Sequence, residues 1–250
     1  MDKLQIEKVN VKEFGNFVSS LIPISDFIYL KATQDELTST CYLPQKDAVK
    51  LHKSKLETVF KTSQTIDKQV KIAFFDGNKV MNALSFFNGV TPQGTLTLSE
   101  NEDHYLATSL VLRDNDLSIT LACAEPSLGF SDIPDDKLQS ILDSNDSKFN
   151  FVLENDMIKK LKSLFKLEGD KDTFTVHLAN DKVNVVGKAY NVFAGSPDQT
   201  QVSEYTSTLY KKYLSLLERY DYHTFVCDSK LVFESPDKNT KLTVAICEEN

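Results

Sequence analysis

The fold is decided most clearly by residues 148–189, which have the sequence KFNFVLENDMIKKLKSLFKLEGDKDTFTVHLANDKVNVVGKA. Residues 148–151 alternate polar and apolar side chains, and Val152 and Leu153 extend the apolar run, which is typical of a strand. Apolar side chains then recur at helical spacing through residues 155–167, and two more alternating runs follow at 173–178 and 182–189. The stretch therefore predicts a strand, a helix and two further strands, in that order.

Local signals mark where the predicted elements begin and end. The helix has Ile158, Leu161 and Phe165 on one face, and Asn155 or Asp156 is of a residue type that caps a helix at its first turn. Elsewhere the same kinds of signal are the capping residue Asp76, the turn Asp114-Asn115-Asp116 and the hairpin dipeptide Asn180-Asp181.

The order strand, helix, three strands recurs four times along the chain. The first copy is expected at 4–11, 12–21, 27–33, 37–43 and 53–60, and the second at 69–75, 77–89, 95–99, 104–113 and 117–124. In the third copy, the last strand is expected at 202–209. The fourth copy overlaps it, with a strand at 205–210, a helix at 212–219 and strands at 222–227, 230–234 and 241–248.

The four copies group into two similar domains. A stretch rich in Pro, Asp and Ser with little periodicity, residues 126–147, separates residues 1–125 from residues 148–250 and is expected to be a connector. The predicted fold class is α+β: two domains, each made of two β-α-β-β-β units, with the helices on one face of antiparallel sheets.

Composition bounds the class of protein. Hydrophobic residues make up 41% and charged residues 26% of the 250 residues, which is typical of a globular chain. No segment approaches the roughly 18 apolar residues of a membrane span, and the charged N-terminus is unlike a signal peptide. We expect a soluble, cytoplasmic protein with no membrane partner, in which the four cysteines are reduced and structural.

Positive charge is concentrated in the predicted helices, although the net charge is −8. Four windows cover the predicted helices: 12–21, 77–89, 155–167 and 211–219. They hold 9 basic and 3 acidic residues, whereas the rest of the chain holds 19 basic and 33 acidic residues. Such a face suits phosphate contact without base readout, although lysines on one amphipathic helix are usually only its solvated face. The candidate DNA-facing residues are Lys12, Lys79, Lys159, Lys160, Lys162, Lys166, Lys211, Lys212 and Arg219.

Motifs of catalysis are not found in the sequence. It contains neither a phosphate-binding G-x-x-x-x-G-K-[ST] loop nor G-x-G-x-x-G, and its four histidines are isolated. No nucleophile, base and orienting group assemble, and no cysteine has metal-ligand spacing. We therefore expect no enzymatic activity, no catalytic residue, no metal site and no cofactor.

Three stretches carry a resemblance to a known family: residues 153–166 with 172–187 (LENDMIKKLKSLFK and DTFTVHLANDKVNVVG), residues 230–235 (KLVFES) and residues 242–248 (LTVAICE). Together with the doubled two-domain pattern they resemble the DNA sliding clamps, which have the proliferating cell nuclear antigen (PCNA)-like fold, and in particular the polymerase clamps of T-even-type bacteriophages.

The resemblance implies a processivity factor without enzymatic activity. A ring of six domains would encircle duplex DNA without sequence specificity, so two domains per chain imply a head-to-tail homotrimer. An ATP-dependent clamp loader would place the ring, and the ring would tether the replicative DNA polymerase and other partners. The implied subunit contacts are Leu117, Ile119, Leu121, Val202, Tyr205 and Leu209, and the implied partner-peptide pocket is Leu128, Phe130, Ile133, Pro134, Ala245 and Ile246.

Two other interpretations stay open. One is a monomeric DNA-binding processivity factor of the same fold, which would hold DNA by one strongly basic face. The other is a β-rich phage structural or adaptor protein with no role on DNA.

Overall fold

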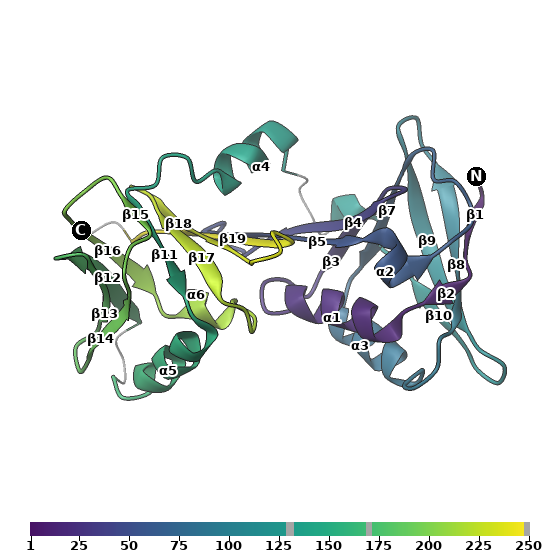
Figure 1. Cartoon of the computed structure of the whole chain (residues 1–250). Helices are drawn as coiled ribbons and strands as arrows, with labels where there is room; N and C mark the ends of the chain where they lie inside the picture. Colours follow the sequence, from purple (N-terminus) through teal and green to yellow (C-terminus); the bar gives the residue numbers. More distant parts are fainter. Residues whose placement is uncertain (129–132, 169–171, 248–250) are drawn as a thin grey trace. The chain divides into compact units, whose positions relative to one another are not determined.

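The computed structural model describes residues 1–128, 133–168 and 172–247 (Figure 1). The chain forms two compact units: residues 1–41 with 50–132, and residues 42–49 with 133–250. The division falls within the stretch expected to be a connector, and the tip of an early hairpin, residues 42–49, groups with the second unit. No helix within the described residues is both long enough and apolar enough to cross a membrane.

The first unit contains two copies of the predicted order. The first copy comprises β1 (Lys3–Ile6), β2 (Lys8–Val9), α1 (Val11–Leu21), β3 (Ile28–Ala32), β4 (Glu36–Tyr42), β5 (Ala48–Lys55), α2 (Leu56–Val59) and β6 (Phe60–Lys61). The second comprises β7 (Gln69–Phe74), α3 (Gly77–Ser85), β8 (Gln93–Glu100), β9 (His104–Arg113) and β10 (Ser118–Ala122), followed by a 3₁₀ turn at Pro126–Leu128.

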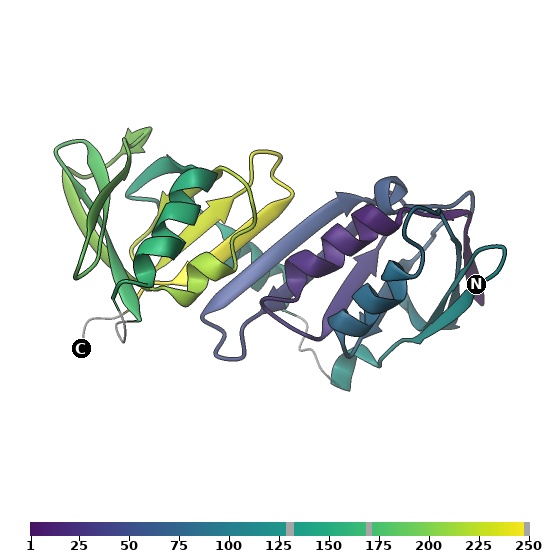
Figure 2. The ribbon, with the colours of Figure 1, turned by 90° about the horizontal axis from the view of Figure 1, so that it is seen from below.

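The strands of this unit lie in the order β1-β8-β9-β7-β3-β4, and β10 pairs with β9. The pairs are antiparallel except β7 with β9, which is parallel. Helices α1 and α3 lie side by side on one face of the sheet (Figure 2). Their apolar stripes are buried, with Phe14, Phe17 and Val18 of α1 at 0–2% exposure. Each such side chain removed from water stabilises the fold by about 1.5–3 kcal/mol.

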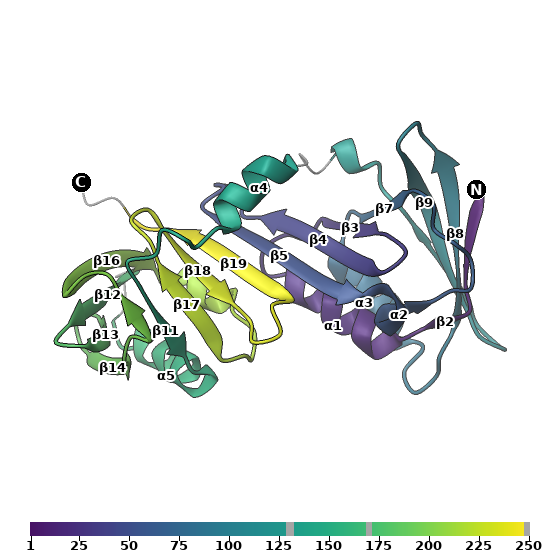
Figure 3. The same cartoon turned by 45° about the horizontal axis from the view of Figure 1, so that its top comes forward.

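The second unit contains the other two copies. The elements are α4 (Asp135–Leu142), β11 (Phe149–Leu153), α5 (Asn155–Phe165), β12 (Thr173–Ala179), β13 (Lys182–Val186), β14 (Asn191–Gly195), β15 (Gln199–Thr200), β16 (Glu204–Tyr210), α6 (Lys212–Ser215), β17 (Tyr222–Val226), β18 (Lys230–Glu234) and β19 (Thr240–Ala245). The strands form the run β19-β18-β17-β11-β15 and a four-stranded sheet β14-β13-β12-β16 (Figures 1 and 3).

The predicted fold class is confirmed, and three element assignments are corrected. The third copy ends on β14, and β16 opens the fourth copy, so the strand expected at 202–209 belongs to the next repeat. The third strand of the first copy begins at Ala48, and residues 56–59 form a helical turn. The predicted connector contains the helix α4.

Helix caps follow the sequence in the first unit and depart from it in the second. Asp76 accepts hydrogen bonds from the backbone N–H groups of Asn78 and Lys79, as predicted. The predicted cap at Asn155 or Asp156 is wrong, because α5 begins at Asn155 and the Asn155 N–H donates to Asp221 Oδ1 at 2.8 Å. A residue of the fourth repeat therefore supplies a cap to the helix of the third.

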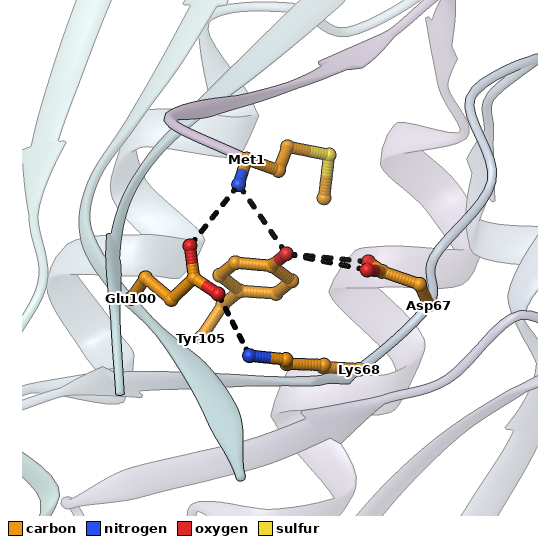
Figure 4. Close-up of polar contacts among 5 residues, drawn as sticks. All are labelled: Met1, Asp67, Lys68, Glu100 and Tyr105. Atoms are coloured by element: carbon orange, nitrogen blue, oxygen red, sulfur yellow. Dashed lines mark hydrogen bonds and ion pairs between the residues drawn. The ribbon is translucent and has the colours of Figure 1, made fainter. Parts of the chain in front are cut away.

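A polar cluster ties the start of the chain to the far end of β8 and β9 (Figure 4). The Met1 amino group lies 3.3 Å from the Tyr105 hydroxyl and 3.6 Å from Glu100 Oε2. Tyr105 donates to Asp67, and Lys68 pairs with Glu100 at 2.7 Å. The Lys68 hydrogen bond lowers the pKa of Glu100. The Lys68 and Glu100 side chains are 32% and 52% exposed, so their ion pair contributes little to stability, whereas Tyr105 is 3% exposed and belongs to the core.

Candidate nucleic-acid interface, partner pocket and sheet edges

The most basic exposed helix surface lies on α5. Ile158 and Leu161 are 1% exposed and face the core, which turns Lys159, Lys160 and Lys166 toward solvent. Lys159 forms an ion pair with Asp156 at 2.8 Å, one turn earlier on the same helix. Lys160 and Lys166 keep ammonium groups that are exposed and can contact an external anion.

Lys162 differs from its neighbours on α5. Its side chain is partly buried, and its ammonium donates to the Leu217 carbonyl just beyond α6 at 3.4 Å. Burial lowers the pKa of Lys162. The stripe expected from Lys159, Lys162 and Lys166 therefore has a middle member that joins α5 to the segment after α6.

Helices α1 and α3 each present one lysine on the solvent side. Lys12 and Lys79 are exposed, and small polar residues fill the rest of each outward stripe. Ser19 and Ser85 donate to carbonyls of their own helices, at 2.9 and 2.7 Å. The outward stripes of α1 and α3 are therefore weakly basic and contain no aromatic side chain.

The basic residues around α6 have different environments. Lys211 is 13% exposed, lies 3.0 Å from Glu168 Oε2 and stacks over the Phe165 ring, so its ammonium is not available to DNA in this structure. Lys212 pairs with Asp47 Oδ2 at 2.6 Å. Arg219 is exposed and lies outside the helix, which ends at Ser215 rather than at the predicted residue 219.

A hollow of about 440 Å³ lies beside α4 in the second unit. The hairpin tip between β4 and β5, the C-terminal end of α4, and strands β18 and β19 surround it. Its lining residues are Lys46, Asp47, Ala48, Val49, Ser140, Ile141, Asp146, Ser229, Lys230, Thr243 and Ala245. Apolar side chains and both signs of charge meet there, as in sites that bind short amphipathic segments.

Two side chains hold α4 against this hollow. Lys230 Nζ donates to the Ser140 and Ile141 carbonyls at 2.8 and 3.2 Å, and Thr243 Oγ1 donates to the Ile141 carbonyl at 3.2 Å. The last carbonyls of a helix carry partial negative charge, so a lysine there is favourable. Leu142, 4% exposed, anchors the same end in the core.

Of the residues expected to form a partner pocket, Ala245 lines this hollow. Leu128 belongs to the first unit and is 71% exposed. Ile133 and Pro134 precede α4, Ile246 follows β19, and Phe130 lies outside the described residues. The hairpin tip at 46–49 and Lys230 were not foreseen, and the spacing of Leu138, Ile141 and Leu142 is the signal that could have revealed α4.

The residues expected at subunit contacts fall on β10 and around β16. Ile119 and Leu121 are half-buried on β10, and Leu117 precedes it. Val202 lies before β16, and the Tyr205 hydroxyl donates to the Cys227 carbonyl at 3.1 Å. Leu209 is 1% exposed, so it packs in the core of its own unit.

The described residues offer little chemistry to a substrate. Among them, no group of three His, Cys, Asp or Glu side chains is placed to hold a metal ion. Burial raises the pKa of Cys41, Cys123 and Cys227 to about 12, which keeps these thiols protonated and weakly nucleophilic.

Similarity to known proteins lies in structure rather than sequence. No family model and no curated protein sequence matches the chain. The structure of PCNA from A. fulgidus, solved with the C-terminal region of FEN-1 bound, aligns with a TM-score of 0.68 over 100% of both chains at 12% identity. PCNA from Entamoeba histolytica aligns with a TM-score of 0.68 over 98% of both chains at 13% identity.

The beta clamp of Helicobacter pylori is also similar. Bound to a DNA ligase peptide, it aligns with a TM-score of 0.66 at 14% identity, covering 99% of this chain and 67% of that one. In its complex with 5-chloroisatin, the match spans 64% of the beta clamp chain. These identities show the fold alone, and that fold is the DNA clamp fold of the sliding clamps.

Proposed function

We propose that this protein is a DNA polymerase processivity factor: a sliding-clamp subunit, without enzymatic activity, that forms a ring around duplex DNA. The observation that carries the proposal is the alignment of four β-α-β-β-β copies with a whole PCNA chain, over 100% of both. Each pair of β-α-β-β-β copies makes one domain, so the chain has two domains. A ring of six domains, as the resemblance to sliding clamps implies, needs three chains, and the proposed assembly is therefore a homotrimer.

The charge distribution supports DNA as the partner. Lys12, Lys79, Lys160 and Lys166 are exposed on helices, whereas the chain as a whole carries −8. Contacts from lysines to phosphates are independent of sequence, which suits a protein that moves along DNA. The acidic remainder would repel DNA from other surfaces.

The hollow beside α4 supports protein partners. The apolar residues Ala48 and Val49 line it, and Lys230 holds the end of α4 beside it. We propose that it receives short peptides of the replicative polymerase and of an ATP-dependent clamp loader. The resemblance of residues 153–166 and 172–187 further suggests a T-even-type phage clamp that acts in the host cytoplasm.

The test is a primer-extension assay with the polymerase and clamp loader of the same genome. The expected result is a longer product per polymerase binding event on circular templates, with loss of the effect on linear DNA from which a ring can slide. No increase in product length would refute the proposal and leave a structural or adaptor role.

A charge-reversal variant tests the inner surface. Lys160→Glu with Lys166→Glu should reduce retention on DNA at least tenfold while the oligomer stays intact, because two phosphate contacts become repulsions. Lys238→Glu, in the turn between β18 and β19, is the matched control. Unchanged retention in the double variant would contradict the assignment of α5 to DNA.

A further inference from the structure

Another hollow, of about 580 Å³, lies in the first unit on strands β1, β8 and β9 (Figure 1). Its volume is typical of binding pockets, which measure roughly 300–1,000 Å³. Two cations, two amides and two threonines supply most of its lining: Lys3, Arg113, Gln5, Gln93, Thr95 and Thr97. Neither the candidate DNA-facing residues nor the hollow beside α4 includes any of them, so this surface has no role in the function proposed above.

The strands give this face a firm floor and a bend. Leu4 and Leu96 are at most 3% exposed and face the core, so their neighbours along β1 and β8 face solvent. The pairing of β8 with β9 shifts register between Thr97 and Leu98, where β9 contributes the extra residue Thr108. A bulge of this kind bends its strand and increases the local twist, which accounts for a hollow on an otherwise open sheet face.

The two cations of the hollow have no ion pair among the described residues. Lys3 and Arg113 are both exposed, and they lie at opposite corners, because Lys3 pairs in register with Thr97 and Arg113 with Gln93. Two strand spacings and four residues along β8 separate them, which places their Cα atoms about 16–17 Å apart. Glu7 is the one carboxylate in the described lining, so this hollow is positive in a chain whose net charge is −8.

Uncharged polar groups fill the space between the two cations. Thr95 donates to Gln5 Oε1 at 2.9 Å, which leaves the N–H groups of the Gln5 amide free, and Ser109 donates to Thr97 Oγ1 at 3.2 Å. The Gln93 side chain has no hydrogen bond among the described residues. An amide side chain can donate to a peptide carbonyl and accept from a peptide N–H. The row therefore matches the alternating donors and acceptors of an extended backbone.

The lining also discriminates between kinds of anionic partner. Single-stranded nucleic acid binds by stacking its bases on aromatic side chains, and this lining has none. Duplex DNA is bound through many phosphate contacts, whereas two separated cations face this hollow. An extended peptide spans about 3.3–3.6 Å per residue, so acidic residues about five positions apart would reach both cations.

We propose that the hollow on β1, β8 and β9 binds an extended acidic segment of a protein partner. Lys3 and Arg113 pair with carboxylates of that segment, and Gln5 and Gln93 bond its backbone between them. The like charge of Glu7 disfavours a further carboxylate beside it, which limits the positions that the segment can adopt. This docking site goes beyond the proposed function, because it is complete within one chain and needs neither a ring nor DNA.

Binding of a synthetic peptide to the full chain tests the site. The probe is EESGSEESGS, blocked at both ends and labelled with a neutral fluorophore, so that glutamate pairs recur five positions apart. Fluorescence anisotropy at low salt should detect binding. Lys3→Gln with Arg113→Gln should weaken it at least about fivefold, since one exposed ion pair contributes up to roughly a factor of five.

The matched control removes the same charge beside the hollow rather than from it. Lys8→Gln with Lys61→Gln changes two exposed lysines on the paired strands β2 and β6, which do not line the hollow. It should change the affinity by less than about twofold, because solvent and salt screen exposed charges that make no direct contact. Circular-dichroism melting curves check that both double variants fold.

Several results would overturn the proposal. Absence of peptide binding to the wild-type chain at low salt would remove the site. An equal loss in the two double variants would show general attraction to positive charge. Undiminished binding of QQSGSQQSGS would remove the need for an acidic segment. An oligodeoxythymidylate that displaces the peptide, and that loses affinity with Lys3→Gln and Arg113→Gln, would assign the hollow to nucleic acid instead. Each result stands apart from the primer-extension assay, so the two proposals fail separately.

Discussion

Replacing Lys211 by methionine tests the ion pair that anchors the end of α5. Glu168 has 0% and Lys211 13% side-chain exposure, and their charged atoms are 3.0 Å apart. At an effective dielectric constant of about 20, charges at this distance attract by about 5–6 kcal/mol, and burial of both charges offsets most of that. Removing the lysine leaves the carboxylate buried without its counter-charge, which costs about 3–5 kcal/mol.

The assay is the midpoint of thermal unfolding at fixed protein concentration, with urea unfolding followed by circular dichroism. For a chain of this size, a loss of 3 kcal/mol corresponds to a fall of about 6–12 °C. Lys159→Met is the control, because Lys159 pairs with Asp156 on the surface and its ammonium is solvated. A Lys211→Met protein that melts within about 1 °C of wild type would refute the burial of the pair.

The same pair predicts a pH dependence. Burial raises the pKa of Glu168, but the Ala189 N–H and Lys211 outweigh it, so the folded-state pKa lies below the usual value. A lowered folded-state pKa stabilises the protein above the unfolded-state pKa, about 4.3, and the contribution disappears as pH falls through the folded-state value. The difference between wild type and Lys211→Met should therefore shrink below about pH 4. A difference that stayed constant as the pH fell from 7 through the acidic range would contradict this account.

Three further changes probe the second unit. Lys230→Met should raise amide hydrogen exchange across α4 by at least tenfold, since two helix-end carbonyls lose a charged donor worth about 1.5–3 kcal/mol; unchanged exchange would contradict the anchor. Gly187→Ala should lower the unfolding midpoint, because the added methyl displaces the Glu168 carboxylate; an unchanged midpoint would mean that the loop relaxes freely. Burial raises the pKa of Asp47, but the hydrogen bonds from Lys212 and Tyr213 outweigh it and lower that pKa, so Asp47→Asn should destabilise at pH 7 and its cost should shrink as the pH falls below about 4, as thermal melts across this range would show.

The element order was predictable because each helix buries a regular apolar stripe. Ile158 and Leu161 on α5, and Val80 and Leu84 on α3, are all at most 2% exposed. Turns followed from residue chemistry as well: Asn180 and Asp181 both adopt positive φ, at 52° and 56°, as a tight hairpin turn requires. Periodicity and turn residues are local properties, so the sequence contains them directly.

The environments of the lysines were not predictable, because they depend on contacts between distant segments. Lys212 pairs with Asp47, 165 residues away in the chain. Lys211, just before α6, pairs with Glu168, which follows α5. The sequence pattern placed both lysines in a basic helical window. Asp47 and Glu168 do not lie at helical spacing from them, so the pattern could not reveal these ion pairs. The same limit explains the cap of α5, where Asp221 substitutes for the local residues that were expected.

Five of the nine candidate cations keep exposed side chains without an ion pair among the described residues: Lys12, Lys79, Lys160, Lys166 and Arg219. Each helical segment thus contributes one or two free cations, which are few for a protein that would hold DNA by charge alone. If all five contact phosphates, the logarithm of the binding constant should fall with the logarithm of salt with a slope of at most about 4–5 per chain. Weak contacts of this kind would permit sliding, and under the proposed function the ring itself would have to retain the DNA.

This reasoning separates a ring from a monomeric processivity factor through binding to short linear duplex DNA. A ring predicts weak binding near physiological salt, combined with stable retention on closed circular DNA after loading and rapid release when the circle is cut. Fluorescence anisotropy on the linear duplex and gel filtration of the loaded circle, before and after restriction cleavage, measure the two quantities. Tight binding to linear duplex with a steeper slope, or retention that survives cleavage, would refute topological retention and favour a monomer that holds DNA by charge alone.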